Sequence, residues 1–522
     1  YKFIHEFGEN DDTNYIEGIY VGYRLFNSVG IKPLYPFGFG KSYTSFDISK
    51  ISLTNEKDEI NIKVKIKNIG KFPGKEVIQI YVSPSQSNES KPYQSLVSFK
   101  KTPNINPSDE IELDLSFKLK SVARYDTKKA SYILDKGNYI IRVGNSSEDT
   151  KIYGYIELDD DITTDILKNI NSGYSTGFND FNPKITLKDE IKNVQKIKLT
   201  KNDFEVKKID YNYEANINKD LLEIKDSDLA YMCLGDFSDI NNRLSGIAGL
   251  TTKNIKEIRN YIRMADGPAG LRLTNFLDNK SSQPYTTAIP ISTALAQTFN
   301  TDLLEKIGNL IATEMEIYNI QLWLAPALNI HRNILCGRNF EYISEDPYLA
   351  GKLAAAIIRG IQENGISACA KHYAVNSQEL RRMAMDSVID ERTLREIYLE
   401  PFEIAVKEGK PGSVMSSYNE VNGVYANENR HLLIEILREE WGFDGAVITD
   451  WGASNDHALG VKNGSTLEMP APGLDSAREL IEAVKSGELS EADIDSRVDE
   501  LIELTLKTQD KKKCSDKNKM HE

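Results

Sequence analysis

The chain has 522 residues, of which 40% are hydrophobic and 27% charged, a balance typical of a globular protein. This length exceeds one ordinary hydrophobic core, so we expect two or three domains. The formal net charge of -14 argues against nucleic acid or an anionic membrane as partner and favours a neutral ligand. No apolar run approaches the roughly 18 residues of a transmembrane helix, so we expect no membrane partner.

The first 45 residues end in the stretch "PFGFGKSYTSF", which is rich in glycine and aromatic residues and is typical of a loop. The start of the chain shows no signal-peptide pattern. The four cysteines lie far apart with no paired spacing, which predicts reduced thiols rather than disulfides or a zinc site. This usage favours a cytoplasmic protein, although only weakly. The cysteines are Cys233, Cys336, Cys369 and Cys514.

Residues 46–158 change to short strands with alternating polarity. The stretch "INIKVKIKNIG" places an isoleucine or valine at every second position from 60 to 66 and then turns at Gly70. Two further runs, "GKEVIQIYVS" and "GNYIIRVG", repeat this pattern of strand and turn. Several such runs predict a small antiparallel sandwich of the immunoglobulin or fibronectin type III kind.

Residues 159–226 are rich in Lys, Asn and Asp and predict a connecting segment. Residues 227–507 then alternate short apolar strands, such as "ISACAKHY" and "GAVITDW", with amphipathic helices, such as "TDLLEKIGNLIATEMEIY". Repeated strand–helix units of this total length predict a TIM-like (β/α) barrel on the C-terminal side. The last residues, 508–522, predict a charged tail. The expected fold class is therefore multidomain, α/β plus all-β.

Polar side chains follow the expected strands of the third region. Because the active site of such a barrel is built where the strands end, we expect these side chains to converge on one mouth. Carboxylates accept hydrogen bonds from sugar hydroxyls, basic side chains donate to them, and tryptophan offers a flat apolar face. Singly, each residue also has an ordinary explanation as a turn or a helix cap. The set is Asp266, Arg272, Arg338, Lys371, His372, Tyr418, Asp450, Trp451 and Glu468.

Eight motifs carry a family resemblance. The third region contains "MADGPAGLR", "GRNFEYISEDP", "AKHYAVN", "MSSYNEVNG", "LLIEILREEWGFDGAVITDWGA" and "LEMP". Nearer the start stand "YIEGIYVGYRLF…PLYPFGFGKSYTSF" and "VKIKNIGKFPGKEVIQIYVSP". Together they resemble glycoside hydrolase family 3, the retaining β-glucosidase-like family. The resemblance implies that Asp450 is the catalytic nucleophile. It also implies a subsite for the non-reducing sugar lined by Asp266, Arg272, Arg338, Lys371, His372, Tyr418 and Trp451.

The order of the motifs resembles a reversed branch of that family. In the common order a barrel precedes an α/β sandwich and a fibronectin-like domain, whereas here the barrel comes last. The resemblance implies that residues 1–45 are the C-terminal remnant of the α/β sandwich, whose loop normally carries the acid/base glutamate. None of Glu6, Glu9 and Glu17 stands in a matching context, so we expect poor hydrolysis of natural glycosides by this chain. We expect as partner either a separate chain that supplies the missing domain or a second copy.

The resemblance also bears on the substrate, for which we expect a β-linked glucoside or oligosaccharide. The stretch "KHYAVNSQE" lacks the glycines and second histidine of the hexosaminidase pattern "KHFPGHG". Asp266, shorter than a glutamate, leaves room for a hydroxymethyl group and favours glucose over xylose. A β-xylosidase and a non-catalytic carbohydrate-binding remnant stay open as alternatives. The six histidines show no ligand spacing, so we expect no metal and no cofactor.

Overall fold

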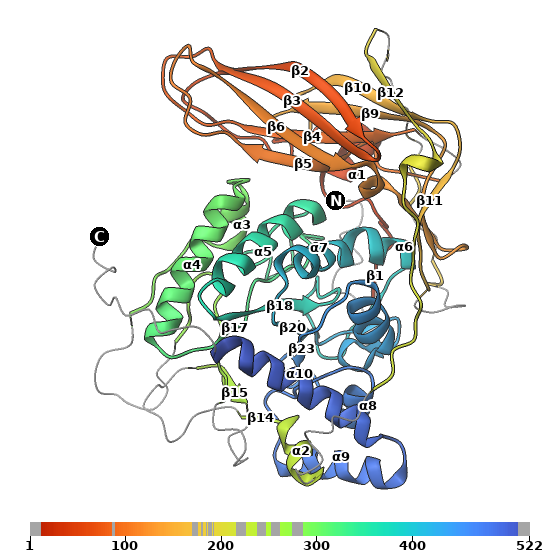
Figure 1. The fold of residues 1–522 in the computed structure, drawn as a ribbon, viewed down its shortest axis with the longest axis vertical. Coiled ribbons are helices and arrows are strands. Elements are labelled where there is room, and N and C mark those ends of the chain that lie inside the picture. The colour runs from red at the N-terminus through yellow and green to blue at the C-terminus, as the bar shows by residue number, and fades with distance from the viewer. Residues whose placement is uncertain are drawn as a thin grey trace.

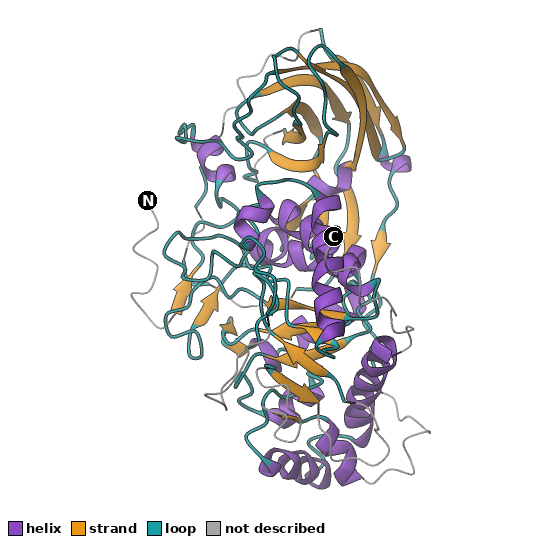
Figure 2. Cartoon of the chain, turned by 90° about the vertical axis from the view of Figure 1, so that its left-hand side faces the viewer, coloured by secondary structure: helices purple, strands orange, loops and turns teal. Residues whose placement is uncertain are grey.

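This computed structural model describes residues 12–85, 89–169, 176–178, 181–183, 185, 191, 193–215, 226–236, 247–251, 261–273 and 285–509. Figure 1 shows two bodies: a β-sandwich at one end and a larger body of mixed helices and strands below it. Figure 2 shows the same division from the side. Within the described residues, no helix is both long and apolar enough to cross a membrane. Residues 1–11 of the predicted α/β-sandwich remnant and residues 510–522 of the predicted charged tail lie outside the described residues.

The sandwich is built from three sheets. One has the strand order β12-β10-β9-β4-β5, the second β2-β3-β6 and the third β13-β11-β8-β7. Its strands are β2 (Phe46–Glu56), β3 (Glu59–Asn68), β4 (Val77–Pro84), β5 (Ser95–Lys101), β6 (Glu110–Lys118), β7 (Arg124–Asp126), β8 (Ser131–Leu134), β9 (Gly137–Gly144), β10 (Thr150–Leu158), β11 (Ile162–Ile166), β12 (Gln195–Leu199) and β13 (Lys207–Lys208).

The alternation read from the sequence decides which face of the sandwich is buried. Ile60, Ile62, Val64 and Ile66 of β3 are all at most 1% exposed, and the lysines between them point away from this core. They pack in one cluster with residues of the opposing sheet, including Ile141. The expected connecting segment adds to the sandwich as well, because β12 pairs in parallel with β10, and β13 with β11.

The larger body is centred on a sheet of order β14-β15-β16-β17-β18-β20-β23. β15 runs antiparallel to both neighbours, and the pairs from β16 to β23 are parallel. A short segment connects the two edges of this sheet. Its Leu467 pairs with Ile448 of the edge strand β23, and its Glu468 pairs with Leu234, next to the other edge strand β14. The antiparallel β15 departs from an all-parallel barrel, and the full TIM-like barrel stays a prediction. The strands are β14 (Gly235–Asp236), β15 (Gly249–Thr251), β16 (Arg263–Ala265), β17 (Leu322–Trp323), β18 (Ser367–Tyr373), β20 (Ser413–Ser416) and β23 (Ala446–Thr449).

Helices cover this sheet, and two of them show why they begin where they do. The side chain of Asn300 accepts from the backbone N–H of Leu303 to cap α4, and Asp346 caps α5 with Pro347 in its first turn. The helices are α2 (Asp226–Met232), α3 (Ser292–Ala296), α4 (Thr301–Ile317), α5 (Pro347–Gln362), α6 (Glu391–Thr393), α7 (Glu400–Ile404), α8 (His457–Lys462), α9 (Leu474–Ser486) and α10 (Glu491–Gln509); π-helical turns flank α7 at Leu394–Leu399 and Ala405–Gly409, and another spans His431–Glu440.

Residues 12–15 belong to the larger body and not to the β-sandwich. β1 (Asp12–Asn14) pairs in parallel with β19 (Asp386–Val388), in a small sheet that also contains β21 (Glu420–Val421) and β22 (Val424–Tyr425). Tyr15 is fully buried in the core of this body, and its hydroxyl donates to the carbonyl of Val375 at 3.0 Å. α1 (Tyr23–Val29) follows and lies beneath the sandwich (Figure 1). The predicted domain boundaries stay predictions.

Candidate active site

The parallel strands bring the predicted polar residues to one edge of the sheet. Asp266 follows β16, Lys371 and His372 lie near the end of β18, and Asp450 follows β23 directly. Tyr418 stands two residues beyond β20. Because parallel strands end at the same edge, residues almost 200 positions apart become neighbours here.

Asp450 lies on the floor of this cluster, 8% exposed. One carboxylate oxygen, Oδ1, accepts the backbone N–H of Trp451 at 2.7 Å. The other, Oδ2, is buried without a hydrogen-bond partner and stands 3.5 Å from Nε2 of His372. Burial raises the pKa of Asp450 above its ordinary value, although the charges of Lys371 and Arg338 oppose this. Burial therefore outweighs these two cations.

Lys371 and Asp266 form a short ion pair. The ammonium of Lys371, 4% exposed, donates to Oδ1 of Asp266 at 2.7 Å. Arg272 approaches the other oxygen of Asp266 at 3.7 Å, and its own side chain is 68% exposed. Burial alone would raise the pKa of Asp266, but Lys371, the backbone N–H of Gly267 and Arg272 together hold it below the ordinary value. Asp266 is therefore an ionised acceptor that two cations flank.

Arg338 joins a loop to the end of β18. Its guanidinium pairs with Glu341, and its Nη2 donates to Nε2 of His372 at 2.8 Å. Burial and the nearby charges of Arg338 and Lys371 lower the pKa of His372 well below its usual value, so this imidazole is neutral. The other ring nitrogen, Nδ1, faces Oδ1 of Asn329 at 3.3 Å.

Two aromatic residues act on the carboxylate of Asp450: Trp451 donates its backbone N–H to Oδ1, and the hydroxyl of Tyr418 lowers the pKa of Asp450. The hydroxyl of Tyr418 donates to the carbonyl of Trp451 at 3.0 Å, and the guanidinium of Arg382 lies 4.5 Å from the centre of the Tyr418 ring. The indole Nε1 of Trp451 donates to the carbonyl of Ala248 at 3.0 Å. The first bond fixes the backbone of Trp451 next to Asp450, and the second fixes its indole ring.

Sequence reasoning misplaced one residue and missed two. Glu468 lies away from the ion pairs and contacts Ser476 and His457, although it closes the sheet edge. Asn329 and Glu341 contact His372 and Arg338, and neither was among the predicted site residues, although Asn329 directly follows the strand-like run "IQLWLAPAL". The two residues lie in the stretches "ALNIHRN" and "GRNFEY". Nothing in these stretches indicates that Asn329 contacts His372 of β18 or that Glu341 pairs with Arg338.

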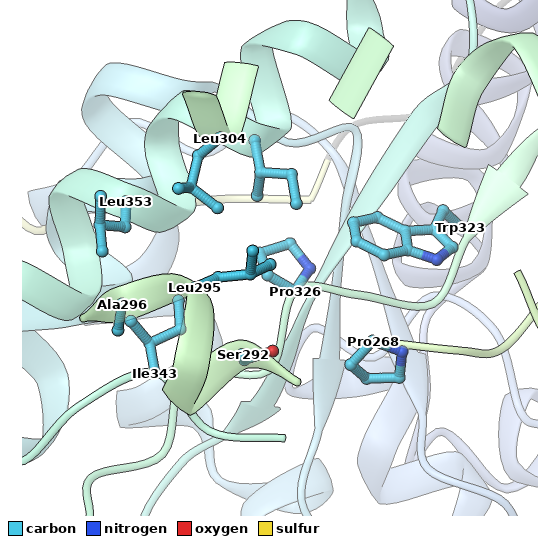
Figure 3. Close-up of a pocket in the computed structure, with 10 residues that line it drawn as sticks. Pro268, Ser292, Leu295, Ala296, Leu304, Trp323, Pro326, Ile343 and Leu353 are labelled. Carbon is cyan, nitrogen blue, oxygen red and sulfur yellow. The ribbon is translucent and has the colours of Figure 1, made fainter. Parts of the chain in front are cut away.

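A separate cavity near this edge is apolar (Figure 3). It lies between the helices α3, α4 and α5 and the loop after β17, and Trp323 and Pro326 form part of its wall. The indole of Trp323 already donates to the carbonyl of Gly267 at 3.2 Å. A cavity with so few free polar groups suits packing rather than a sugar with many hydroxyls.

Two family models match the chain. Residues 247–504 match "Glycosyl hydrolase family 3 N terminal domain", and residues 76–147 match "Fibronectin type III-like domain". The prediction of a fibronectin type III-like domain ahead of a family 3 domain is thereby confirmed.

Curated relatives agree with these matches. Beta-glucosidase A of Butyrivibrio fibrisolvens is 35% identical over 96% of this chain and 66% of its own length. Thermostable beta-glucosidase B of Acetivibrio thermocellus is 45% identical over 48% of this chain and 34% of its own length. The beta-glucosidase of Ruminococcus albus is 29% identical over 96% of this chain and 56% of its own length. The chain thus spans between about one third and two thirds of these relatives.

Solved structures of beta-glucosidases have a similar fold. A beta-glucosidase from Paenibacillus barengoltzii superposes with a TM-score of 0.84 at 30% identity, over 97% of this chain and 60% of that one. Beta-glucosidase 3B from Thermotoga neapolitana, solved in complex with glucose, superposes with a TM-score of 0.53 at 41% identity, over 55% of this chain and 42% of that one. Through its two matched domains and these relatives, the chain belongs to glycosyl hydrolase family 3.

Proposed function

We propose that this chain carries the sugar-binding and nucleophilic part of a retaining β-glucosidase, with Asp450 as the nucleophile. The observation that supports this most is the carboxylate of Asp450: Oδ1 accepts a backbone N–H, and the buried Oδ2 has no donor at hydrogen-bond distance among the described residues, although the hydroxyl of Tyr418 is near enough to lower the pKa of Asp450. An oxygen without a donor keeps its lone pairs free to attack the anomeric carbon. Its place at the end of β23, beside cations and a neutral imidazole, suits a glycosyl-enzyme intermediate.

The surrounding residues would bind the sugar that is transferred. Asp266 presents an ionised carboxylate to a pair of neighbouring hydroxyls, and Lys371 and Arg338 donate to others. Trp451 would contact the apolar face of the ring. The glucose complex of the Thermotoga neapolitana relative supports glucose as the ligand. A β-xylosidase and a carbohydrate-binding protein without activity are the alternatives.

We further propose that this chain alone protonates the leaving group poorly. The carboxylates described around Asp450 are engaged in ion pairs, Asp266 with Lys371, Glu341 with Arg338 and Glu379 with Arg382. General acid assistance accelerates such reactions by about 10²–10⁴-fold. The acid would then come from outside the described residues.

Mechanism-based labelling tests the nucleophile. A dinitrophenyl 2-deoxy-2-fluoro-β-glucoside should attach covalently to Asp450, with the adduct located by peptide mass spectrometry. D450N should bind the reagent and form no adduct. Saturable binding by the natural chain with no adduct on Asp450 would favour the non-catalytic alternative.

A comparison of substrates with different leaving groups tests whether a general acid acts within this chain. We expect the dinitrophenyl glucoside, whose leaving group needs no proton, to form the glycosyl-enzyme far faster than methyl glucoside does. The ratio of the two rates should exceed that of a complete retaining glucosidase by about a hundredfold or more. Similar ratios for both proteins would show that an acid operates within this chain.

A further inference from the structure

Asn329, which lies between β17 and the loop of Arg338, contacts His372 at three atoms. Its Oδ1 accepts the backbone N–H of His372 at 2.9 Å, and its Nδ2 donates to the backbone carbonyl of His372 at 2.9 Å. Because a backbone N–H only donates and a carbonyl only accepts, these two bonds determine which end of the amide is oxygen. The same Oδ1 then faces ring atom Nδ1 of His372 at 3.3 Å.

These contacts select one tautomer of the imidazole. An amide oxygen only accepts, so Nδ1 of His372 carries the hydrogen. A guanidinium only donates, so Nε2, 2.8 Å from Nη2 of Arg338, carries the lone pair. Both partners are buried, Asn329 at 2% and His372 at 1% exposed, so water competes little for either nitrogen.

The tautomer matters for the nucleophile. Nε2 of His372 stands 3.5 Å from Oδ2 of Asp450. In the opposite tautomer, with the hydrogen on Nε2, the ring would donate to that oxygen and engage the lone pairs that attack the sugar. In the Nδ1–H tautomer that these contacts select, the ring has no hydrogen to give to Oδ2, which accounts for the lack of a hydrogen bond from His372 to that oxygen.

We propose that Asn329 is a positioning residue that holds His372 in the Nδ1–H tautomer and thereby keeps Oδ2 of Asp450 free to react. The inference rests on the proposed role of Asp450 as nucleophile. Asn329 itself acts through His372.

Three variants separate this role from simple structural support. N329A removes the acceptor for Nδ1–H and both backbone bonds. N329D loses the bond to the carbonyl of His372 but keeps an acceptor for Nδ1–H; burial and the nearby cations still oppose protonation of the ring. The matched control is N422A, because Asn422 forms the same two-bond clamp on the backbone N–H and carbonyl of Ile389, in another loop.

The first measurement is nitrogen NMR of histidine-labelled protein, whose two-bond couplings differ between the tautomers. We expect the Nδ1–H pattern for His372 in the natural chain, N329D and N422A, and an Nε2–H or mixed pattern in N329A. The second measurement is the labelling rate of Asp450 by the fluoroglucoside. We expect labelling at least about tenfold slower in N329A, and within about threefold of the natural chain in N329D and N422A.

Each outcome bears on a different statement. An unchanged tautomer in N329A, or equal loss of labelling in N329A and N329D, would overturn the inference. A changed tautomer with unchanged labelling would overturn its link to Asp450. Failure of the natural chain to form any adduct would count against the nucleophile, while the NMR result would still decide whether Asn329 sets the tautomer.

Discussion

Lys371 shows how one residue can control the charge of another across the sheet. Its ammonium donates to Asp266 at 2.7 Å and, with Arg272, holds the pKa of Asp266 below the ordinary value despite burial. If the ionised carboxylate binds sugar hydroxyls, glucose binding should persist at mildly acidic pH and disappear only as pH falls through this depressed pKa.

Replacement of this lysine should therefore change the pH dependence as well as the affinity. In K371M the pKa of Asp266 rises, so the acid midpoint of glucose binding should move to higher pH, and affinity at pH 7 should fall about tenfold or more. Calorimetric titration with glucose from pH 3 to 8 measures the affinity and shows whether the acid midpoint of K371M lies above that of the natural chain. D266N should bind weakly at every pH. A K371M midpoint equal to that of the natural chain would contradict this account.

At the scale of elements, α4 and α5 meet through glycines. A Cβ atom on Gly360 of α5 would stand 2.0 Å from the carbonyl oxygen of Glu305 in α4, and one on Gly308 of α4 would stand 2.4 Å from that of Ile357. These oxygens belong to backbone, so they yield only if the helices separate. The absence of a Cβ atom at Gly308 and Gly360 therefore allows the two helices to pack closely over the sheet.

G360A should therefore lose stability although alanine favours a helix. The gain in helix propensity is about 1 kcal/mol, and the forced separation of the helices should outweigh it, for a net loss of about 1–3 kcal/mol. Urea unfolding of G360A measures this loss. G40A is the control, because a Cβ there meets no atom within 4 Å. Equal stability of G360A and the natural chain would mean that the helices rearrange at no cost.

At the scale of the whole molecule, a cavity of about 560 Å³ separates the sandwich from the helical segment around α7. Glu400 lines it, and burial together with Asp346, Glu403 and Glu396 raises the pKa of Glu400 to about 8, against the opposing charge of Arg24. Because the pKa in the folded chain lies above the usual 4.5, the ionised side chain destabilises the fold increasingly as pH rises from about 4.5 to 8.

E400Q should relieve this cost, since glutamine has the same shape and no charge. We expect E400Q to be more stable than the natural chain by about 2 kcal/mol above pH 8, and equally stable near pH 4.5; the value is modest because the cavity has room for water. Thermal unfolding across this pH range measures the difference. E408Q is the control, since Glu408 lines the same cavity and pairs with Lys352, and is not among the charges that raise the pKa of Glu400. A stability difference for E400Q that does not vary with pH would rule out ionisation as its cause.

Elements with a repeating pattern or a motif can be predicted from the sequence alone. The alternation from Ile60 to Ile66 predicted the buried face of β3, and the apolar runs predicted β18 and β23. These signals are local, because periodicity reflects which side of a strand meets the core. The motif around Asp450 pointed to family 3 for the same reason: its residues are adjacent in the chain.

Which side chains meet, and what charge they carry, depends on how the chain packs in three dimensions. Asn329 reaches His372 across 43 positions, and Lys371 reaches Asp266 across 105, separations at which no local pattern is visible. Glu468 follows a strand-like run as Asp450 does, yet it contacts His457 and Ser476 instead. The pKa of Asp450 depends on the balance between burial and two cations, Lys371 and Arg338, that are close in space but far away in the sequence. Such balances arise from packing in three dimensions, which single positions in a sequence do not encode.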